Sequence, residues 1–133
     1  LLTIPANTMT ASSTIQVRGN ANCNPATCYI KIVNANGTPF VTSSDFAPTA
    51  GTDSLVTFVA DIFPNYSVSS QKSVLYSTSV QTTGTLDGNQ FKNYANEGTS
   101  SFDLSATFSV GIVLNISTAN NFTMNNYTIK VSP

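Results

Sequence analysis

The sequence predicts an all-β fold built from antiparallel strands, and three observations carry this prediction. Apolar residues occupy every second position between Phe102 and Ile116, and only an extended strand places such a series on one face. Turn-forming residues separate several shorter alternating stretches. No stretch shows the 3.6-residue period of an amphipathic helix. A strand with one face on a core and the other toward solvent is typical of antiparallel sheets.

The alternating stretches give the strands expected in the first half of the chain. They cover residues 13–18, 28–33, 39–41 and 54–62. Asn34–Gly37 reads as a turn in which Gly37 is free to take a positive φ, so the second and third strands form a hairpin. The stretch 54–62 carries apolar residues on both faces and ends before Pro64, so we expect it to be buried on both sides.

The second half of the chain continues the pattern. We expect strands over residues 73–81, 102–116 and 122–131, and a turn at 87–89. The strand over 102–116 would span roughly 50 Å at about 3.3 Å per residue, so we expect a bend or bulge near Gly111. Residues 89–97 are expected to hold a single helical turn or a loop. About seven strands at this spacing predict one immunoglobulin-like β-sandwich.

Composition limits the function. A chain of 133 residues fits one domain, and 41% of it is apolar, which is enough for a core. Charged residues make up only 8% of the chain, against roughly 25% in ordinary domains. The five cations are spread along the chain, so we expect no nucleic-acid binding. No apolar run is long enough for a membrane span, and Leu1–Ile4 is too short for a signal-peptide core, so we expect a processed chain.

The residues that most enzymes need are missing or scattered. The chain has no His, which removes the usual base of a Ser or Cys nucleophile. Ser69–Lys72 matches the S-x-x-K spacing by chance composition, without its accompanying motifs. Glu97 and five Asp read as surface or turn residues rather than as a catalytic or calcium-binding set. We therefore expect no enzyme activity, no catalytic residues, no metal and no cofactor.

The two cysteines, Cys23 and Cys28, are separated by four residues. A zinc site needs further Cys or His ligands, and the chain has none left. The remaining interpretations are a small-loop disulfide, which we favour, and two unpaired thiols. A disulfide indicates an oxidising compartment, such as the cell exterior.

Five triplets match the acceptor pattern for N-linked glycans, which belongs to secreted proteins. Their asparagines are Asn36, Asn65, Asn115, Asn121 and Asn126. Three of the five fall within 115–126, where glycans would coat one end or one face. Glycans would provide the solubility that the few charges do not.

Exposed strand edges are the main problem for such a neutral sandwich. Edges are usually protected by Lys or Pro because their unpaired N–H and C=O groups attract other strands. The segment 1–9 is apolar and extended, with Leu2, Ile4 and Ala6 facing one way, and a polar run separates it from Ile15. It pairs either within its own domain or with a neighbouring copy by strand addition. Repeated head to tail, the second arrangement builds a filament.

Taken together, the apolar N-terminal strand, the strand count, the scarcity of charge, the hydroxyl-rich surface and the acceptor triplets resemble the archaeal thread filament subunit. This family consists of glycosylated pilins joined by donor-strand complementation, and the chain is also similar in plan to chaperone-usher pilins. The resemblance implies a donor-strand segment over 1–12, with Leu1, Leu2, Ile4 and Ala6 as its contacts, and a sandwich pilin domain over 13–133. It also implies that the acceptor asparagines carry glycans.

The leading interpretation is a structural subunit of an extracellular, cell-surface filament with a role in adhesion or biofilm formation. Its partners would be copies of itself and N-linked glycans. The second interpretation is a secreted carbohydrate-binding or cell-envelope adhesion module, in which Tyr and Phe form a sugar platform, although the chain lacks Trp. A secreted hydrolase of unrecognised type is the third.

Overall fold

The computed structural model describes residues 1–9, 12–23, 28–45, 54–67, 70–81, 91–100, 107–116 and 122–132. Within these ranges the chain contains nine strands and no helix, which confirms the predicted all-β class. One sheet contains, in order, β1 (Leu2–Ile4), β8 (Phe108–Ile116), β3 (Cys28–Val33) and β4 (Pro39–Thr42). The other contains β7 (Phe91–Ser100), β6 (Ser70–Gln81), β5 (Ser54–Ser67), β2 (Thr14–Cys23) and β9 (Phe122–Ser132).

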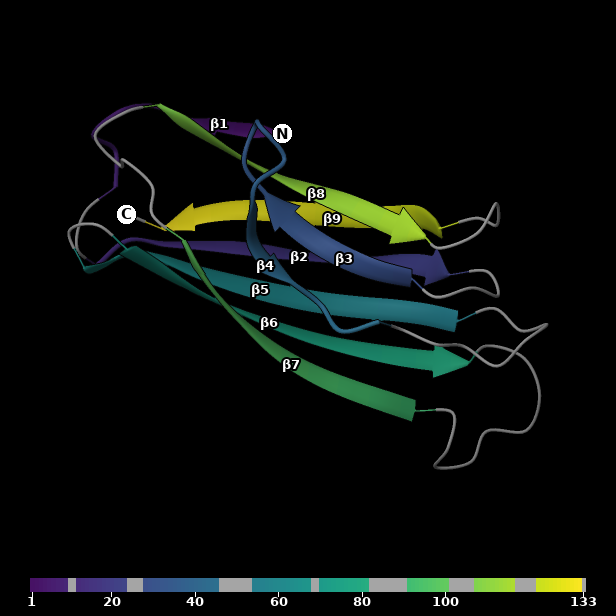
Figure 1. Cartoon of the computed structure of the whole chain (residues 1–133). Helices are drawn as coiled ribbons and strands as arrows, with labels where there is room; N and C mark the ends of the chain where they lie inside the picture. The colour runs from purple at the N-terminus through teal and green to yellow at the C-terminus, as the bar shows by residue number, and fades with distance from the viewer. Residues whose placement is uncertain are drawn as a thin grey trace.

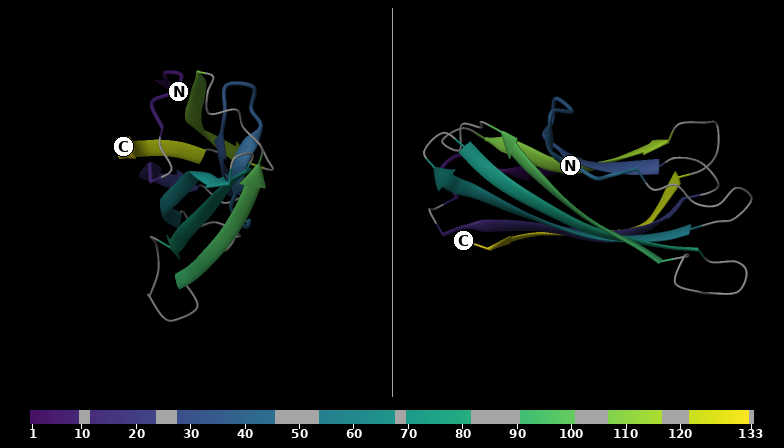
Figure 2. Two further views of the ribbon diagram at one scale, coloured as in Figure 1. Left: turned by 90° about the vertical axis from the view of Figure 1, so that its left-hand side faces the viewer. Right: turned by 60° about the horizontal axis from the view of Figure 1, so that its bottom comes forward.

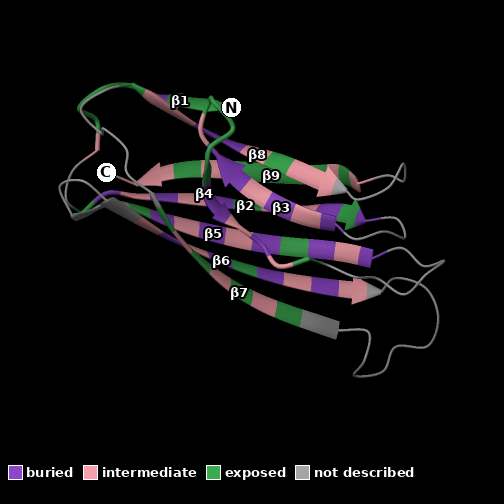
Figure 3. Cartoon of the chain, in the orientation of Figure 1, coloured by how far each residue is buried: buried purple, intermediate pink, exposed green. Residues whose placement is uncertain are grey.

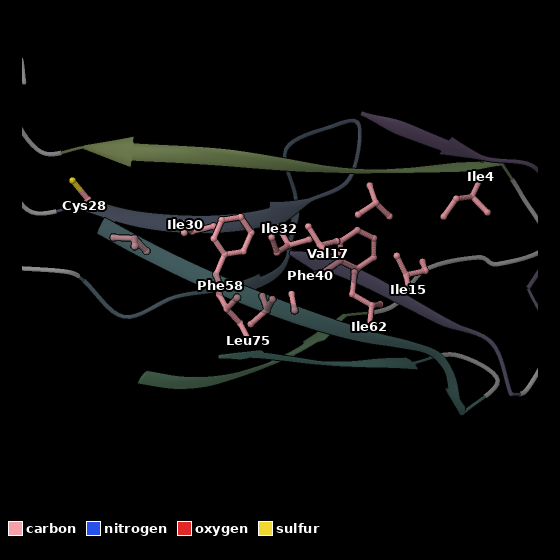
Figure 4. Close-up of a cluster of buried hydrophobic side chains, with 14 of the residues drawn as sticks. Ile4, Ile15, Val17, Cys28, Ile30, Ile32, Phe40, Phe58, Ile62 and Leu75 are labelled. Carbon is pink, nitrogen blue, oxygen red and sulfur yellow. The ribbon is translucent and has the colours of Figure 1, made fainter. Parts of the chain in front are cut away.

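The two sheets form the layers of a sandwich, and all strand pairs are antiparallel (Figures 1 and 2). The arrangement is consistent with the predicted immunoglobulin-like sandwich. Buried residues are concentrated on β2, β3, β5 and β6 (Figure 3). Their apolar side chains meet between the layers, where Ile15, Ile30, Phe58 and Ile62 belong to one cluster (Figure 4). Burial of this alternating set is the main stabilising term of the fold.

The first hairpin agrees with the sequence-based prediction. β3 covers Cys28–Val33, and β4 follows a turn in which Gly37 has a φ of +79°. The Asn34 carbonyl oxygen accepts a hydrogen bond from the Gly37 N–H at 3.0 Å. The Asn34 side-chain oxygen also accepts bonds from the Asn36 and Thr38 N–H groups, at 2.9 and 3.0 Å. Asparagine stabilises such turns in this way.

The disulfide between Cys23 and Cys28 is present, as predicted. Cys23 ends β2 in the five-stranded sheet, and Cys28 begins β3 in the four-stranded sheet. Both residues are fully buried at one end of the core. The bond therefore joins the two layers, which is a larger role than fixing a loop before a strand.

One side of the sandwich is closed, where β4 lies against β7. A Cβ atom built on Gly98 of β7 would lie 2.9 Å from the carbonyl carbon of Phe40 and 2.9 Å from the Cα atom of Val41. Real Cβ atoms do not approach backbone so closely, so only glycine fits. Close by, the Asn96 side chain accepts a hydrogen bond from the Ser44 N–H at 3.0 Å and donates one to the Ser44 hydroxyl at 3.1 Å.

The helical turn or loop expected over 89–97 was wrong, because most of this segment belongs to strand β7 (Phe91–Ser100). It pairs along its whole length with β6. Asn93 accepts a hydrogen bond from the Thr78 hydroxyl at 3.0 Å, and Asn96 bonds Ser44 as described above. Pairing with an available sheet edge has overridden the weak local preference of a polar segment.

Strand β5 also differs from expectation in its length and its burial, since it runs past Pro64 to Ser67. On β5 the inward residues Val56, Phe58, Ala60 and Ile62 are buried, while Thr57 and Phe63 on the outward face are exposed, so only one face is buried. On β6 the more apolar series points outward.

The outward series of β6 includes Val74, Val80 and Tyr76, which is 55% exposed. The inward series is Ser73, Leu75, Ser77 and Ser79, all buried. The hydroxyls of Ser73 and Ser77 have no hydrogen-bond partner.

The bulge or bend expected near Gly111 stays a prediction, because neither pairing of β8 crosses this position. β1 pairs with β8 as far as Val110, and β3 pairs with β8 from Gly111 onward, on the opposite side. A register shift does occur where β2 pairs with β9, between Asn20 and Ala21. It lets Met124 before the shift and Ile129 after it both pack against the core.

Candidate functional site

The N-terminal strand pairs within its own chain. The sequence left open whether this segment pairs within its own domain or with a neighbouring copy, and the single chain shows the first arrangement. Leu2 lies opposite Val110, Thr3 opposite Ser109 and Ile4 opposite Phe108. Figure 1 shows β1 beside only one half of β8.

The residues predicted as strand contacts are held very unequally. Ile4 is only 3% exposed and belongs to the core, whereas Leu1 is 73% exposed and Leu2 is 37% exposed. Ala6 lies beyond the end of β1, in a turn, and is exposed. The one-sided alternation expected from Leu2 to Ala6 therefore stops at Ile4. Much of the apolar surface of this segment stays in contact with water.

Leu1 lies over Gly111 on the outer face of β8. A Cβ atom built on Gly111 would clash with the end of the Leu1 side chain and lie 3.2 Å from its Cγ atom. The Leu1 Cα atom is the nearest backbone atom, at 3.7 Å. Gly111 thus leaves a shallow socket on the strand, in which a side chain from the neighbouring strand is seated.

The direction of the β8 backbone groups follows from the hydrogen bonds of Ile30 on β3. The Ile30 carbonyl oxygen accepts a bond from the Ser43 N–H at 2.8 Å, and its N–H donates to the Ser43 hydroxyl at 2.9 Å. Both groups point away from β8. Opposed residues of an antiparallel pair alternate between exchanging two hydrogen bonds and exchanging none. Leu114, opposite Ile30, and Ile112, opposite Ile32, therefore direct their N–H and C=O groups away from β3.

These groups face an edge that no strand of the described residues pairs with. β1 pairs with Phe108–Val110, and β3 pairs with Gly111–Ile116 from the opposite side. The β1 side of Gly111–Ile116 is therefore an open strand edge, which we call the open edge. Unpaired strand edges bind other strands readily.

A groove lies along the open edge, between β8 and β9. It has a volume of about 250 Å³, and its lining residues are Leu1, Gly111, Ile112, Leu114, Met124, Tyr127 and Ile129. The apolar side chains from β8 and β9 pack against the core but are only half-buried. The two layers thus meet closely at β4 and β7 and leave an apolar opening at β8 and β9. An extended apolar segment fits such an opening both through its backbone and through its side chains.

The acceptor asparagines are distributed over both layers. Asn36 is exposed in the turn between β3 and β4. Asn115 is half-buried on β8, and Asn126 is exposed on β9, where it accepts a hydrogen bond from the Asn20 amide at 2.9 Å. Asn65 belongs to β5, and the position predicted at Asn121 lies outside the described residues.

The charged side chains do not converge on a site in the described part of the chain. Glu97 pairs with Lys72 at 3.4 Å on the surface, and Asp61 accepts a hydrogen bond from Gln16 at 3.0 Å. Asp45 is exposed. Within the same ranges, no cluster of His, Cys, Asp and Glu is positioned to hold a metal, and no helix is long and apolar enough to span a membrane.

The sequence did not reveal the groove. Ile112 and Leu114 stood out as members of an alternating strand, and Ile129 as part of another, but nothing in the pattern places these two strands at one opening. Met124 carried no signal of its own. The pattern of apolar residues identifies faces of strands, whereas an opening depends on which strands become neighbours.

Comparisons with known protein families, with curated proteins and with solved structures found no match.

Proposed function

We propose that this chain is the structural subunit of an extracellular filament that polymerises head to tail. Each subunit donates its N-terminal segment, 1–12, to the sandwich formed by 13–133 of the next subunit. The observation that carries the proposal is the open edge of β8, which lies above an apolar groove and continues the line of β1. The filament would act mechanically, in adhesion or biofilm formation.

The weak attachment of β1 to its own chain supports the exchange of this segment between chains. β1 has three residues, and only Ile4 is buried, while Leu1 and Leu2 remain exposed. A segment with so few buried contacts opens easily. Its release exposes the rest of the β8 edge to the same segment of a neighbour. Because the donating and accepting surfaces differ, the contact is heterologous, and its repetition without ring closure builds a filament.

The surface chemistry supports a location outside the cell. The disulfide fits an oxidising compartment. A net charge of −1 produces little repulsion between copies. Glycans at exposed acceptor asparagines, such as Asn36 and Asn126, would keep the neutral surface soluble.

The proposal is tested by two matched variants in adjacent positions of β1. Leu2→Asn places an amide where the donated strand enters the apolar groove, and it should abolish filaments in negative-stain electron microscopy. Thr3→Asn changes the outward face and should leave filaments intact. Leu2 is already 37% exposed in the single chain, so both variants should melt within a few degrees of the parent. A parent chain that stays monomeric under all assembly conditions, or Leu2→Asn filaments, would refute the proposal.

A second candidate function is a carbohydrate-binding module, supported by Tyr76. This residue is 55% exposed on the outer face of the five-stranded sheet, beside Ala95 on β7. Asn93 and Thr78, which share a hydrogen bond of 3.0 Å, present amide and hydroxyl groups next to it. Aromatic rings flanked by such groups suit sugar rings. Retardation of a monomer on a glycan column, lost in Tyr76→Ala, would favour this function over the filament.

A further inference from the structure

Building on the proposed function, we infer that the donated strand binds its neighbour four residues further along β8 than β1 binds within its own chain. Within one chain Leu2 lies opposite Val110 and Ile4 opposite Phe108. In the filament Leu2 lies opposite Leu114 and Ile4 opposite Ile112. We call these two arrangements the internal register and the shifted register.

The shift must be an even number of residues. Successive side chains of a strand point to opposite faces, so an odd shift would turn Leu2 and Ile4 out of the core. In the internal register these two residues share the inward face with Val110 and Phe108. Shifts of two, four and six residues keep this orientation.

Backbone hydrogen bonding favours a shift of four over a shift of two. The N–H and C=O groups of Ile112 and Leu114 point toward the open edge. They form hydrogen bonds only if residues of the donated strand with hydrogen-bonding groups directed at β8 lie opposite both of them. A shift of four places Ile4 and Leu2 there. A shift of two brings only Leu2 opposite one of them, because Ile4 then lies opposite Val110.

Side-chain size favours the same shift. In the shifted register Leu2 and Ile4 both enter the groove beside Met124 and Ile129. A shift of six would place the small Ala6 opposite Ile112 and leave part of the groove empty, and unfilled apolar space weakens binding because contacts are lost.

Pro5 fits the shifted register because it lies opposite Gly111. Gly111 directs its own N–H and C=O groups toward Val33 on β3, so the residue opposite it on the open edge exchanges no backbone hydrogen bonds. Proline has no N–H to donate, and it loses nothing at such a position, which it occupies after any even shift. What is particular to the shift of four is the glycine opposite the proline ring. The missing Cβ of Gly111, which leaves room for Leu1 in the single chain, leaves room for the proline ring in the filament.

Cysteine pairs on the outward face distinguish the registers. Thr3 is exposed and lies opposite Ser109 in the internal register, opposite Val113 in the shifted register and opposite Asn115 after a shift of six. All these pairs are of the close kind that exchanges no hydrogen bonds, which suits disulfides. The Thr3→Cys variant is mixed separately with Ser109→Cys, Val113→Cys and Asn115→Cys under filament-forming conditions and mildly oxidised. Only bonds between different chains produce a dimer in these mixtures.

We expect a disulfide-linked dimer from the mixture of Thr3→Cys with Val113→Cys and no dimer from the other two mixtures. Thr3→Cys alone, with the native disulfide intact, serves as the control for disulfide exchange. Dimers from the Ser109→Cys or Asn115→Cys mixture, in samples that contain filaments, would overturn the register but leave the filament standing. If no mixture forms filaments or dimers although the single variants fold, both the register and the proposed function are refuted.

Discussion

Two glycines in strands allow the packing of the closed side of the sandwich to be compared with that of the open side. Gly98 lies at the closed side and Gly111 at the open side. Gly98→Ala and Gly111→Ala make the same chemical change in the same kind of element, so their intrinsic preferences cancel. Each gains about 0.4–1 kcal/mol because alanine restricts the unfolded chain. The difference between them comes from the neighbours of the added methyl group.

At Gly98 the neighbours are backbone atoms of β4, and two of them would lie 2.9 Å from the methyl carbon. Backbone atoms cannot move away as the end of a side chain can. The loss in free energy of unfolding is therefore near the upper end of the range for overpacking, about 3 kcal/mol. The net loss is about 2.5 kcal/mol, which for a domain of this size lowers Tm by roughly 10 °C. At Gly111 only the exposed side chain of Leu1 must move. We expect a change within about 1 kcal/mol of the parent.

Differential scanning calorimetry of the two variants at one pH and scan rate measures the contrast. Circular dichroism of both folded variants checks that the strand content is unchanged. A Gly98→Ala variant as stable as the parent would mean that β4 and β7 are not in contact, and the picture of one closed side would be wrong. An equal loss in Gly111→Ala would mean that this site is as tightly packed as the core, which contradicts the open groove.

Two further predictions concern the core and the disulfide. Ser77→Ala removes a buried hydroxyl without a hydrogen-bond partner and should stabilise the fold by up to about 1 kcal/mol. Ser43→Ala removes both hydrogen bonds of a buried hydroxyl and should destabilise the fold by about 1–3 kcal/mol. Urea denaturation measures both changes. A loss in Ser77→Ala would contradict its unpaired state. Replacing Cys23 and Cys28 together with Ala should cost at least about 2 kcal/mol, the loop-entropy value for so short a ring. An unchanged Tm would show that the bond adds nothing to the joining of the layers.

The first hairpin was predictable because all its information is local. The alternation of Cys28–Val33, the turn at Asn34 and the freedom of Gly37 each act within a few residues. The closing strand was predictable for the same reason, since Ile129 and Val131 follow a period of two.

The rest depends on contacts between distant segments. The strand around Asn93 and Asn96 exists because β6 offers an edge and because side chains far away in sequence accept and donate hydrogen bonds. The serines on the inner face of β6 invert the usual pattern, so the apolar side of that strand indicates the wrong face. The groove requires knowing that the segment after Val110 changes its pairing partner from β1 to β3, a property of the topology alone.

The Cys23–Cys28 bond also bears on how a filament subunit would carry tension. A pull would enter through the donated segment, which leads into β2, and leave through the neighbour's strand bound to β8. β2 and β8 belong to different layers, and β3 is hydrogen-bonded to β8. In such a filament the Cys23–Cys28 bond would transmit the load directly from β2 to β3 and bypass residues 24–27. The two layers then cannot slide apart by lengthening their connection, so the donated strand would be released before the subunit is pulled open.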